Sequence, residues 1–458
     1  MMIFSLASKI DRKSTNNYMM LEKESIALLR KAVEKLEEGF GAPNDVSTYD
    51  YSAMEKVLLE VATRMQNNYP YANPLFAGQM IKPPHPIART AYQLAMWVNP
   101  NNHALDGGRE SSRMEKEVVA DLAKMIGFDQ HLGHLTGGGT MANMEALWVA
   151  SQVKTGKILA SDQAHYTHQR MCEVLKIPFE KVLSDQHGRM DLVDLENKLK
   201  AGDVGTVVVT MGTTGLGMVD PLDKILALRE KYHFRIHADA AYGGYFRLAK
   251  NLANETQLKY QLLKEVDSVV IDPHKHGLQP YGCGCVLFNN PDVAKFYLHD
   301  SPYTYFTSDD LHLGEISLEC SRAGASAVGL WATHQLLPPV EGGQFSKDLE
   351  QCRSAASDLA QRIQASDKFL LIGEPELDIV VWAVKAKSSK EMSEKADHLF
   401  EEAEKQGLFL SKYKVLSEKV KSDGIEINSE YVTCLRSCLL KPEHKGWIDK
   451  IWTILCQL

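Results

Sequence analysis

A lysine between two histidines is the residue of this sequence best suited to covalent chemistry. It lies in residues 272–280, DPHKHGLQP, directly after a short run of β-branched residues. Lysine is rarely fully buried without a functional reason, and a lysine just past a core strand is a candidate for Schiff-base formation. Lys275 could therefore bond to a carbonyl compound. The competing interpretation is a surface loop lysine, which the segment taken alone favours.

Two more polar residues follow β-branched runs. Asp239 lies in residues 237–241, HADAA, and His165 ends residues 161–165, SDQAH. A buried carboxylate needs a partner, and a protonated ring nitrogen is one such partner. Each residue also has an ordinary interpretation, because Asp239 could cap a helix or form a salt bridge and His165 could be structural.

A glycine-rich turn precedes a helical run in residues 136–149. In TGGGT at 136–140, the glycines would let the backbone approach an anion, and the start of a helix would supply free N–H groups. Gly138, Gly139 and Thr140 thus form a plausible phosphate cup, with a flexible turn as the alternative. The sequence contains no GxxxxGK[ST] motif, and GTTGLG at 212–217 lacks the glycine spacing of a dinucleotide site.

A metal site is the alternative from a different class of chemistry. Asp272, His274 and His276 alternate in sequence and, if extended, could face one ion together with His237 or Asp239. That arrangement would indicate a metal-dependent hydrolase. It would leave both Lys275 and the glycine cup unexplained.

Strands that alternate with helices must position these residues. Short apolar runs at 157–161, 206–211, 235–240, 268–272 and 284–288 predict strands that are buried between helix layers. Asp220 and Pro221 predict an N-cap and a first helical position before a periodic face. The alternation predicts an α/β fold with a largely parallel sheet, in which ligands bind at the carboxyl ends of the strands.

The chain has 458 residues, and its pattern changes twice along the sequence. Helical spacing at 22–40 predicts an N-terminal helical segment within residues 1–75. The alternating region predicts a large domain at 76–345, and residues 346–458 predict a small C-terminal α+β domain.

Composition excludes several classes of protein. The net charge of −8 argues against a nucleic-acid binder, and no apolar run approaches the ~20 residues of a membrane span. Eight cysteines are too few for a disulfide scaffold and lack zinc-knuckle spacing. We expect a reduced, cytoplasmic protein.

Taken together, these motifs resemble the group II pyridoxal-phosphate (PLP) decarboxylases, which have the type I aspartate aminotransferase fold and act on glutamate, tyrosine and other aromatic amino acids. The resemblance covers roughly residues 70–445. It rests on TGGGT at 136, SDQAHY at 161, GTT at 212, HADAAYGG at 237, DPHKHG at 272, SLECSRAGAS at 317 and LRSCLLKPEH at 435.

The resemblance implies a role for each matching residue. Lys275 would form the Schiff base with PLP, and Asp239 would pair with the pyridine nitrogen. His165 would stack on one face of the ring, and Ala241 would lie under the other. The remaining implied cofactor contacts are Gly138, Gly139, Thr140, Thr213, Thr214, His274 and Ser321.

The resemblance also implies that a tyrosine on a mobile loop protonates Cα after CO2 has left. Tyr303 and Tyr305 are the candidates, and Phe306 nearby leaves an aldehyde-forming outcome open. The implied substrate contacts are Gln79, Asn102, Arg322 and Arg436.

The resemblance further implies a homodimer with active sites at the interface. A PLP-dependent carbon–carbon lyase stays the nearest alternative, and the substrate stays open between an acidic and an aromatic amino acid.

Overall fold

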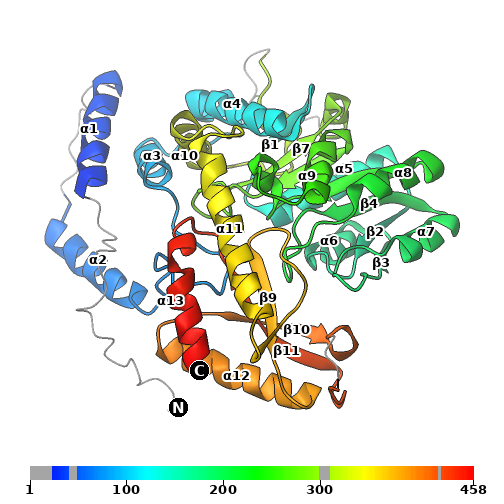
Figure 1. Ribbon diagram of the computed structural model, residues 1–458. Coiled ribbons are helices and arrows are strands. Elements are labelled where there is room, and N and C mark those ends of the chain that lie inside the picture. The colour runs from blue at the N-terminus through cyan, green and yellow to red at the C-terminus, as the bar shows by residue number, and fades with distance from the viewer. Residues whose placement is uncertain (1–22, 41–48, 299–309, 421–423) are drawn as a thin grey trace. The chain divides into compact units, whose positions relative to one another are not determined.

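The chain divides into two units, residues 1–73 and 74–458. The computed structural model (Figure 1) describes residues 23–40, 49–298, 310–420 and 424–458. The first unit contains helices α1 (Lys23–Phe40) and α2 (Tyr51–Met65), and the α1 range agrees with the helical spacing of the sequence. Asp50 caps α2 by accepting a hydrogen bond from the amide of Ala53.

A seven-stranded sheet in the second unit carries the motifs. The strand order is β1-β7-β6-β5-β4-β2-β3, and all pairings are parallel except the two made by β7. The strands are β1 (Leu132–Thr136), β2 (Lys157–Ser161), β3 (Phe179–Val182), β4 (Val204–Thr210), β5 (Arg235–Asp239), β6 (Ser268–Ile271) and β7 (Gly284–Phe288). The predicted α/β fold with a mostly parallel sheet is confirmed. The short strands β1 and β3 were not predicted.

Helices cover both faces of this sheet. Val207 and Val208 are consecutive residues of β4, so their side chains lie on opposite faces of the sheet. Val207 packs with residues of α4, α7 and α8, and Val208 packs with residues of α5 and α6. The helices of this region are α3 (Pro86–Met96), α4 (Arg109–Ile126), α5 (Gly139–Val153), α6 (Thr167–Leu175), α7 (Leu192–Lys200), α8 (Leu222–Tyr232), α9 (Asn254–Gln261) and α10 (Gly324–Leu336). Short 3-10 helices span Leu105–Gly107, Gly244–Leu248, Leu262–Glu265, Pro291–Phe296, Leu313–Ile316 and Ser417–Lys419.

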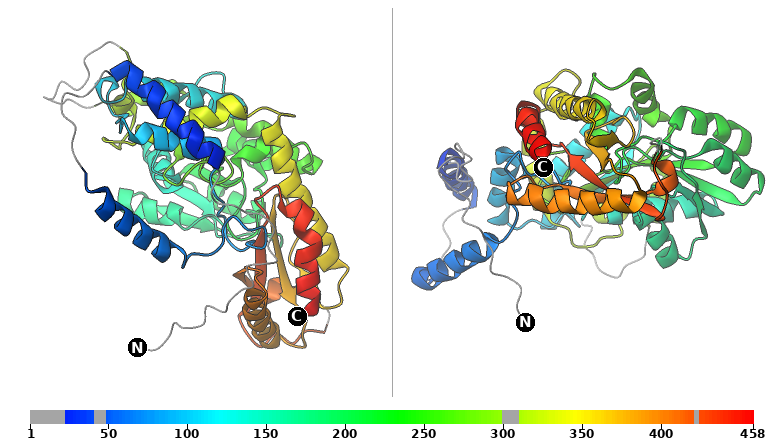
Figure 2. Two further views of the ribbon diagram at one scale, coloured as in Figure 1. Left: turned by 90° about the vertical axis from the view of Figure 1, so that its left-hand side faces the viewer. Right: turned by 60° about the horizontal axis from the view of Figure 1, so that its bottom comes forward.

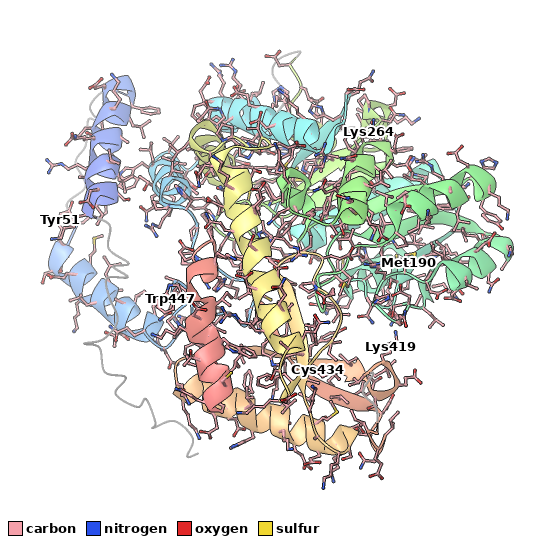
Figure 3. All side chains as sticks on the ribbon, viewed as in Figure 1. Tyr51, Met190, Lys264, Lys419, Cys434 and Trp447 are labelled. Carbon is pink, nitrogen blue, oxygen red and sulfur yellow. The ribbon has the colours of Figure 1, made fainter. Side chains whose placement is uncertain are left out.

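A smaller antiparallel sheet follows in the order β10-β11-β9-β8. Its strands are β8 (Phe369–Leu371), β9 (Ile379–Val384), β10 (Ser411–Leu416) and β11 (Tyr431–Cys438). Helices α11 (Gln344–Gln364), α12 (Ser389–Lys405) and α13 (His444–Gln457) pack against one face, and α11 and α13 lie side by side (Figure 2). The other face contributes residues such as Cys434, labelled in Figure 3, to the core of the large sheet. The predicted boundary at 345/346 falls in the first turn of α11.

One local prediction was wrong. Asp220 does not cap α8, because its buried carboxylate accepts hydrogen bonds from the amides of Met190 and Thr210, both at 2.7 Å. Burial raises the pKa of Asp220 to about 6. The side chain thus joins two backbone segments instead of starting a helix.

No helix within the described ranges is both long and apolar enough to cross a lipid bilayer.

Candidate active site

The carboxyl ends of β1, β2, β4, β5 and β6 lie at one edge of the large sheet, because these strands run in the same direction. A cavity of about 420 Å³ opens there, a volume within the usual range for small-molecule sites. The predicted site residues that line it are Gly138, Gly139, Thr140, His165, Thr214, Asp239, Ala241, His274 and Lys275.

Lys275 enters the cavity from the turn after β6. Its Nζ lies 3.0 Å from Oδ2 of Asp272, and its side chain is 23% exposed. Asp272 is buried, and its Oδ1 has no hydrogen-bond partner among the described residues. His274 is held by its Nδ1, which lies 2.8 Å from the carbonyl oxygen of Cys283. The amine of Lys275 is therefore positioned by one carboxylate and remains open to the cavity.

Asp239 ends β5 and lines the same cavity. Its Oδ1 accepts a hydrogen bond from the amide of Ala241 at 3.1 Å, and its Oδ2 accepts one from Nε2 of His168 at 2.9 Å. Burial alone would raise the pKa of Asp239, but the hydrogen bond and charge of His168, with the charge of Lys275, hold the pKa well below its usual range. Asp239 is therefore an ionised carboxylate at neutral pH.

The glycine turn approaches the Lys275 segment closely. Gly138 has a φ of 145°, and a Cβ on Gly139 would lie 2.6 Å from Oδ2 of Asp272. Gly138 is the N-cap of α5, and no side chain caps that end of the helix. The first N–H groups of α5 are therefore uncapped at the cavity, and the lack of a side chain at Gly139 allows the close approach to Asp272. Uncapped N–H groups at a helix start suit an anion.

His165 and Ala241 both line the cavity, from the ends of β2 and β5. Nδ1 of His165 lies 2.6 Å from Oγ1 of Thr167, and the ring lies 4.4 Å from the ring of Tyr166, centroid to centroid. Burial lowers the pKa of His165, so the ring is neutral at physiological pH. A flat neutral ring and a small side chain are the surfaces that an aromatic cofactor needs on its two faces.

Three residues predicted as contacts do not line this cavity. Thr213 is fully buried, and its hydroxyl accepts a hydrogen bond from the amide of Met218. Asn102 is fully buried and donates to Glu115 at 2.6 Å. Arg322 donates to Glu115 at 2.7 Å and to the carbonyl oxygen of Leu135. Asn102 and Arg322 thus stabilise the loop around Asn102, Thr213 stabilises the turn at 213–218, and none of the three lines the cavity.

Three further predicted residues, Gln79, Ser321 and Arg436, do not line the cavity. Gln79 is exposed, and Ser321 is exposed and accepts a hydrogen bond from Asn101. Arg436 is buried on β11, where Nη1 donates to Ser411 and Nε has no partner among the described residues. Tyr303 and Tyr305, like Phe306, lie outside the described residues.

The metal alternative is wrong for the described residues, among which no cluster of three His, Cys, Asp or Glu side chains could hold an ion. The turn after β6 separates the predicted ligands. Nε2 of His274 lies 3.6 Å from Asp272, whereas Nε2 of His276 lies 3.3 Å from Asp378, which precedes β9. The segment is not extended, so its alternating residues do not share a face.

Sequence reasoning missed several residues of the site, three of which are aromatic or imidazole side chains next to predicted ones. His168 is the partner of Asp239, and Tyr166 and Tyr281 line the cavity, where the Tyr281 ring lies 4.7 Å from that of His274. His168 stands three residues after His165, a spacing that could have indicated a shared helix face. Nothing in the sequence pairs it with Asp239.

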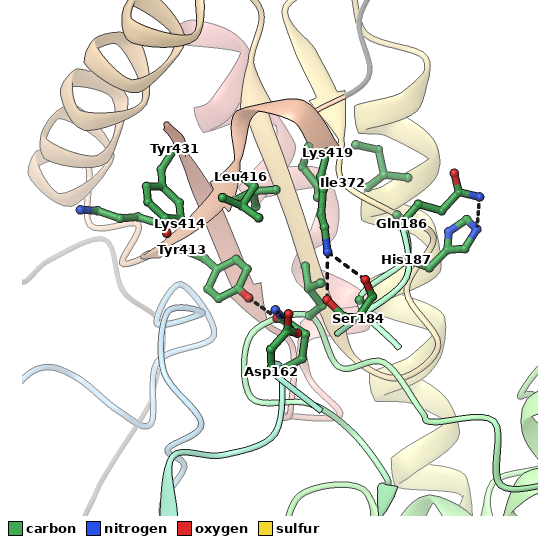
Figure 4. Close-up of a pocket in the computed structure, with 16 residues that line it drawn as sticks. Asp162, Ser184, Gln186, His187, Ile372, Tyr413, Lys414, Leu416, Lys419 and Tyr431 are labelled. Atoms are coloured by element: carbon green, nitrogen blue, oxygen red, sulfur yellow. Dashed lines mark hydrogen bonds between the residues drawn. The ribbon is translucent and has the colours of Figure 1, made fainter. Parts of the chain in front are cut away.

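A second cavity, of about 380 Å³, lies between the small sheet and the ends of β2 and β3 (Figure 4). Tyr413 on β10 donates a hydrogen bond to Gln163 at 2.6 Å, and Lys419 donates to Ser184 at 2.9 Å. Because Gln163 lies two residues before His165, this contact connects the small sheet to the active-site loop.

The residues around the first cavity fit PLP. The glycine cup and the start of α5 suit a phosphate, Asp239 suits a protonated ring nitrogen, and Lys275 suits an aldehyde. The orphaned Oδ1 of Asp272 marks a polar position that lacks a partner within the described chain.

Comparison with known proteins agrees with this chemistry. The family described as pyridoxal-dependent decarboxylase conserved domain matches residues 143–385, more than half of the chain. The chain is 28% identical over 400 residues to L-tyrosine decarboxylase of Enterococcus faecium, and the match covers 65% of this chain and 65% of that protein. It therefore spans slightly less than two thirds of that relative's length.

Two further proteins are similar in sequence or fold. The chain is 27% identical over 335 residues to L-aspartate/L-glutamate decarboxylase of Pyrococcus horikoshii, covering 72% of this chain and 85% of that protein. The crystal structure of mouse CSAD superposes with a TM-score of 0.77 at 19% identity, covering 95% of this chain and 98% of that one. The family match, supported by a shared fold, shows that the chain belongs to the pyridoxal-dependent decarboxylase family.

Proposed function

We propose that the protein removes the α-carboxyl group of an L-amino acid as CO2, using PLP bound through Lys275. One observation carries the proposal: Lys275 and the ionised Asp239 face one cavity, beside a glycine cup at the start of α5. PLP, when bound, supplies a carbonyl carbon for an amine and a ring that withdraws the electron pair left at Cα.

The chain's own residues would make that ring effective. Asp239 stays ionised and can hold a proton on the ring nitrogen, which the withdrawal of electrons requires. Gly138, Gly139 and Thr140 can bind the phosphate through backbone N–H groups and a hydroxyl. His165 and Ala241 would confine the ring from its two faces and exclude water from them.

The substrate is an acidic or an aromatic amino acid, as the names of the relatives indicate. Arg436 supports the acidic choice. Arg436 lies on the same face of β11 as Cys434 and Cys438, which pack into the core of the large sheet. The guanidinium is buried with one nitrogen unpartnered among the described residues, so it could bind a second carboxylate.

The test is CO2 release from tyrosine, aspartate and glutamate by the PLP-loaded protein and by Arg436→Gln. We expect an amine and CO2 from one substrate class. If that class is acidic, Arg436→Gln should raise KM about tenfold or more, because hydrogen bonds to charged groups are strong. A PLP-loaded protein that releases no CO2 from any amino acid would contradict the proposal, and an aldehyde product would indicate the aldehyde-forming alternative.

Two parts of the proposal rest on the resemblance alone. The proton donor to Cα would be Tyr303 or Tyr305, and the active form would be a homodimer in which Ser321 serves the neighbouring site. Sedimentation of the PLP-loaded protein tests the dimer, and a monomer that releases CO2 would contradict it.

A further inference from the structure

The carboxylate of Asp239 is held from behind by His168. His168 is the second residue of α6, and its Nε2 lies 2.9 Å from Oδ2 of Asp239, with exposures of 1% and 7% for the two side chains. The other oxygen of Asp239 accepts the amide hydrogen of Ala241. Two donors from two different elements therefore fix the plane of the carboxylate, and its remaining lone pairs point to the cavity that Asp239 lines.

Within the described residues, the hydrogen bond to Asp239 is the one side-chain hydrogen bond of His168 that would explain its burial. Its Nδ1 is buried and has no hydrogen-bond partner among the described residues. The neighbouring His237 differs, because its Nδ1 lies 2.8 Å from Ser268 and its Nε2 lies 2.8 Å from Asn143. An apolar side chain would fill the site of His168 without leaving a nitrogen unsatisfied. The hydrogen bond to Asp239 therefore offsets the free-energy cost of burying this imidazole.

We propose that His168 is a positioning residue for the cofactor: by donating to Asp239 it keeps that carboxylate ionised and oriented, and so secures the proton on the pyridine nitrogen. The inference rests on the proposed function, since it assumes that PLP occupies the cavity. A hydrogen bond from a buried donor to a carboxylate is strong in a dry environment, where it also restricts rotation of the carboxylate.

The proposed role of His168 acts on the pyridine nitrogen of PLP, so an analogue that lacks this nitrogen can test it. 1-Deaza-PLP replaces the ring nitrogen with a C–H group and keeps the aldehyde and the phosphate. Binding of PLP and of the analogue to the cofactor-free protein would be measured by absorbance titration. The proteins compared are wild type, His168→Phe, His168→Gln and His168→Asn. His134→Gln is the matched control, because its side chain is equally buried and its Nε2 also lies within hydrogen-bond distance of a carboxylate, that of Glu145, rather than of Asp239.

Wild type should bind PLP about tenfold or more tightly than the analogue. His168→Phe should lose most of that preference by weakening PLP binding alone. His168→Gln, whose amide nitrogen reaches the position of Nε2, should restore it, whereas the shorter His168→Asn should not. His134→Gln should change stability and leave the preference unchanged.

Two results would overturn the inference. In the first, His168→Phe weakens PLP and the analogue equally, which would be a purely structural effect. In the second, His168→Gln and His168→Asn show the same preference for PLP over the analogue. This comparison tests the inference even if His168→Phe does not fold. A wild type that binds neither compound would instead contradict the proposed function, so the two failures are distinguishable.

Discussion

At the scale of single residues, the site depends on the absence of a side chain at Gly139. A Cβ there would lie 2.6 Å from Oδ2 and 3.0 Å from Oδ1 of Asp272, and Asp272 in turn holds the amine of Lys275. The backbone of the cup and the Lys275 turn can approach each other only because this position is glycine. Gly139 thereby lets the glycine turn lie against the segment that carries Lys275.

Gly139→Ala should therefore weaken PLP binding by tenfold or more and destabilise the fold by about 1–3 kcal/mol, the usual cost of overpacking. PLP titration and urea unfolding would measure the two effects. Gly446→Ala in α13 is the matched control, because a Cβ there meets nothing within 4 Å. The control should be neutral or stabilising, and a Gly139 variant that behaves like it would show that the cup tolerates a side chain.

Much of the site could be predicted from residue types, and the failures have one physical cause. Lys275, Asp239 and His165 follow strands, so sequence order alone brings them to one edge. Asn102 and Arg322 resemble ligand-binding residues in type, but Glu115, distant in sequence, takes their hydrogen bonds. Only the three-dimensional fold reveals such partners.

At the scale of elements, a buried contact connects the end of β5 to the start of β9. The hydroxyl of Tyr242, which lines the active-site cavity, donates to Oδ1 of Asp378 at 2.7 Å. Burial raises the pKa of Asp378 to about 6, while the hydrogen bond from Tyr242 acts against that rise. His276, next to Lys275, lies 3.3 Å from the other oxygen of Asp378. The segment at the start of β9 thus contacts both the segment after Asp239 and the segment that carries Lys275.

Tyr242→Phe should cost about 1–3 kcal/mol in the free energy of unfolding, because it leaves a buried carboxylate oxygen without its donor. Tyr245→Phe is the matched control. Its hydroxyl is buried without a partner among the described residues, so its removal should be neutral or stabilising. Urea unfolding of both variants measures the difference, and equal losses would mean that the Tyr242 hydroxyl contributes no specific contact.

Strands were predictable where the sequence contains a continuous apolar run. The runs at β2 and β7 have the bounds that the sequence predicted, and the run at 235–240 extends one residue past the end of β5. Strands β1 and β3 were missed because neither is a continuous apolar run: β1 contains Gly133 and His134, and β3 contains Glu180 and Lys181 and is largely half-buried or exposed.

At the scale of the whole molecule, buried histidines and buried carboxyl groups affect the pH dependence of stability in opposite directions. Burial lowers the pKa of His237 and of His444 to about 3, and it raises the pKa of Asp220 and of Asp378 to about 6. A histidine whose pKa is lower in the folded state binds fewer protons there than in the unfolded chain. It therefore makes stability fall as pH drops below the unfolded value of about 6.5. The two carboxyl groups act in the opposite direction between pH 4 and 6.

His444→Asn should reduce this acid sensitivity. Asparagine can accept the hydrogen bond that Nδ1 of His444 accepts from the amide of Lys441, and it does not titrate. Between about pH 4 and 6, the slope of the free energy of unfolding against pH should be lower in the variant than in wild type by about 1.4 kcal/mol per pH unit, because one group that loses stability on acidification has been removed. Urea unfolding across that range tests this. The exposed His187, replaced by Asn, should leave the slope unchanged, and parallel curves for His444→Asn and wild type would contradict the prediction.

The central claim is that Lys275 bonds covalently to PLP. The most direct measurement is borohydride reduction of the PLP-loaded protein, followed by mass spectrometry of its peptides. Wild type should show a yellow absorption band that disappears on reduction and a pyridoxyl group attached to Lys275. Lys275→Ala should show neither. A wild type that stays colourless with PLP, or a pyridoxyl group on another lysine, would contradict the account.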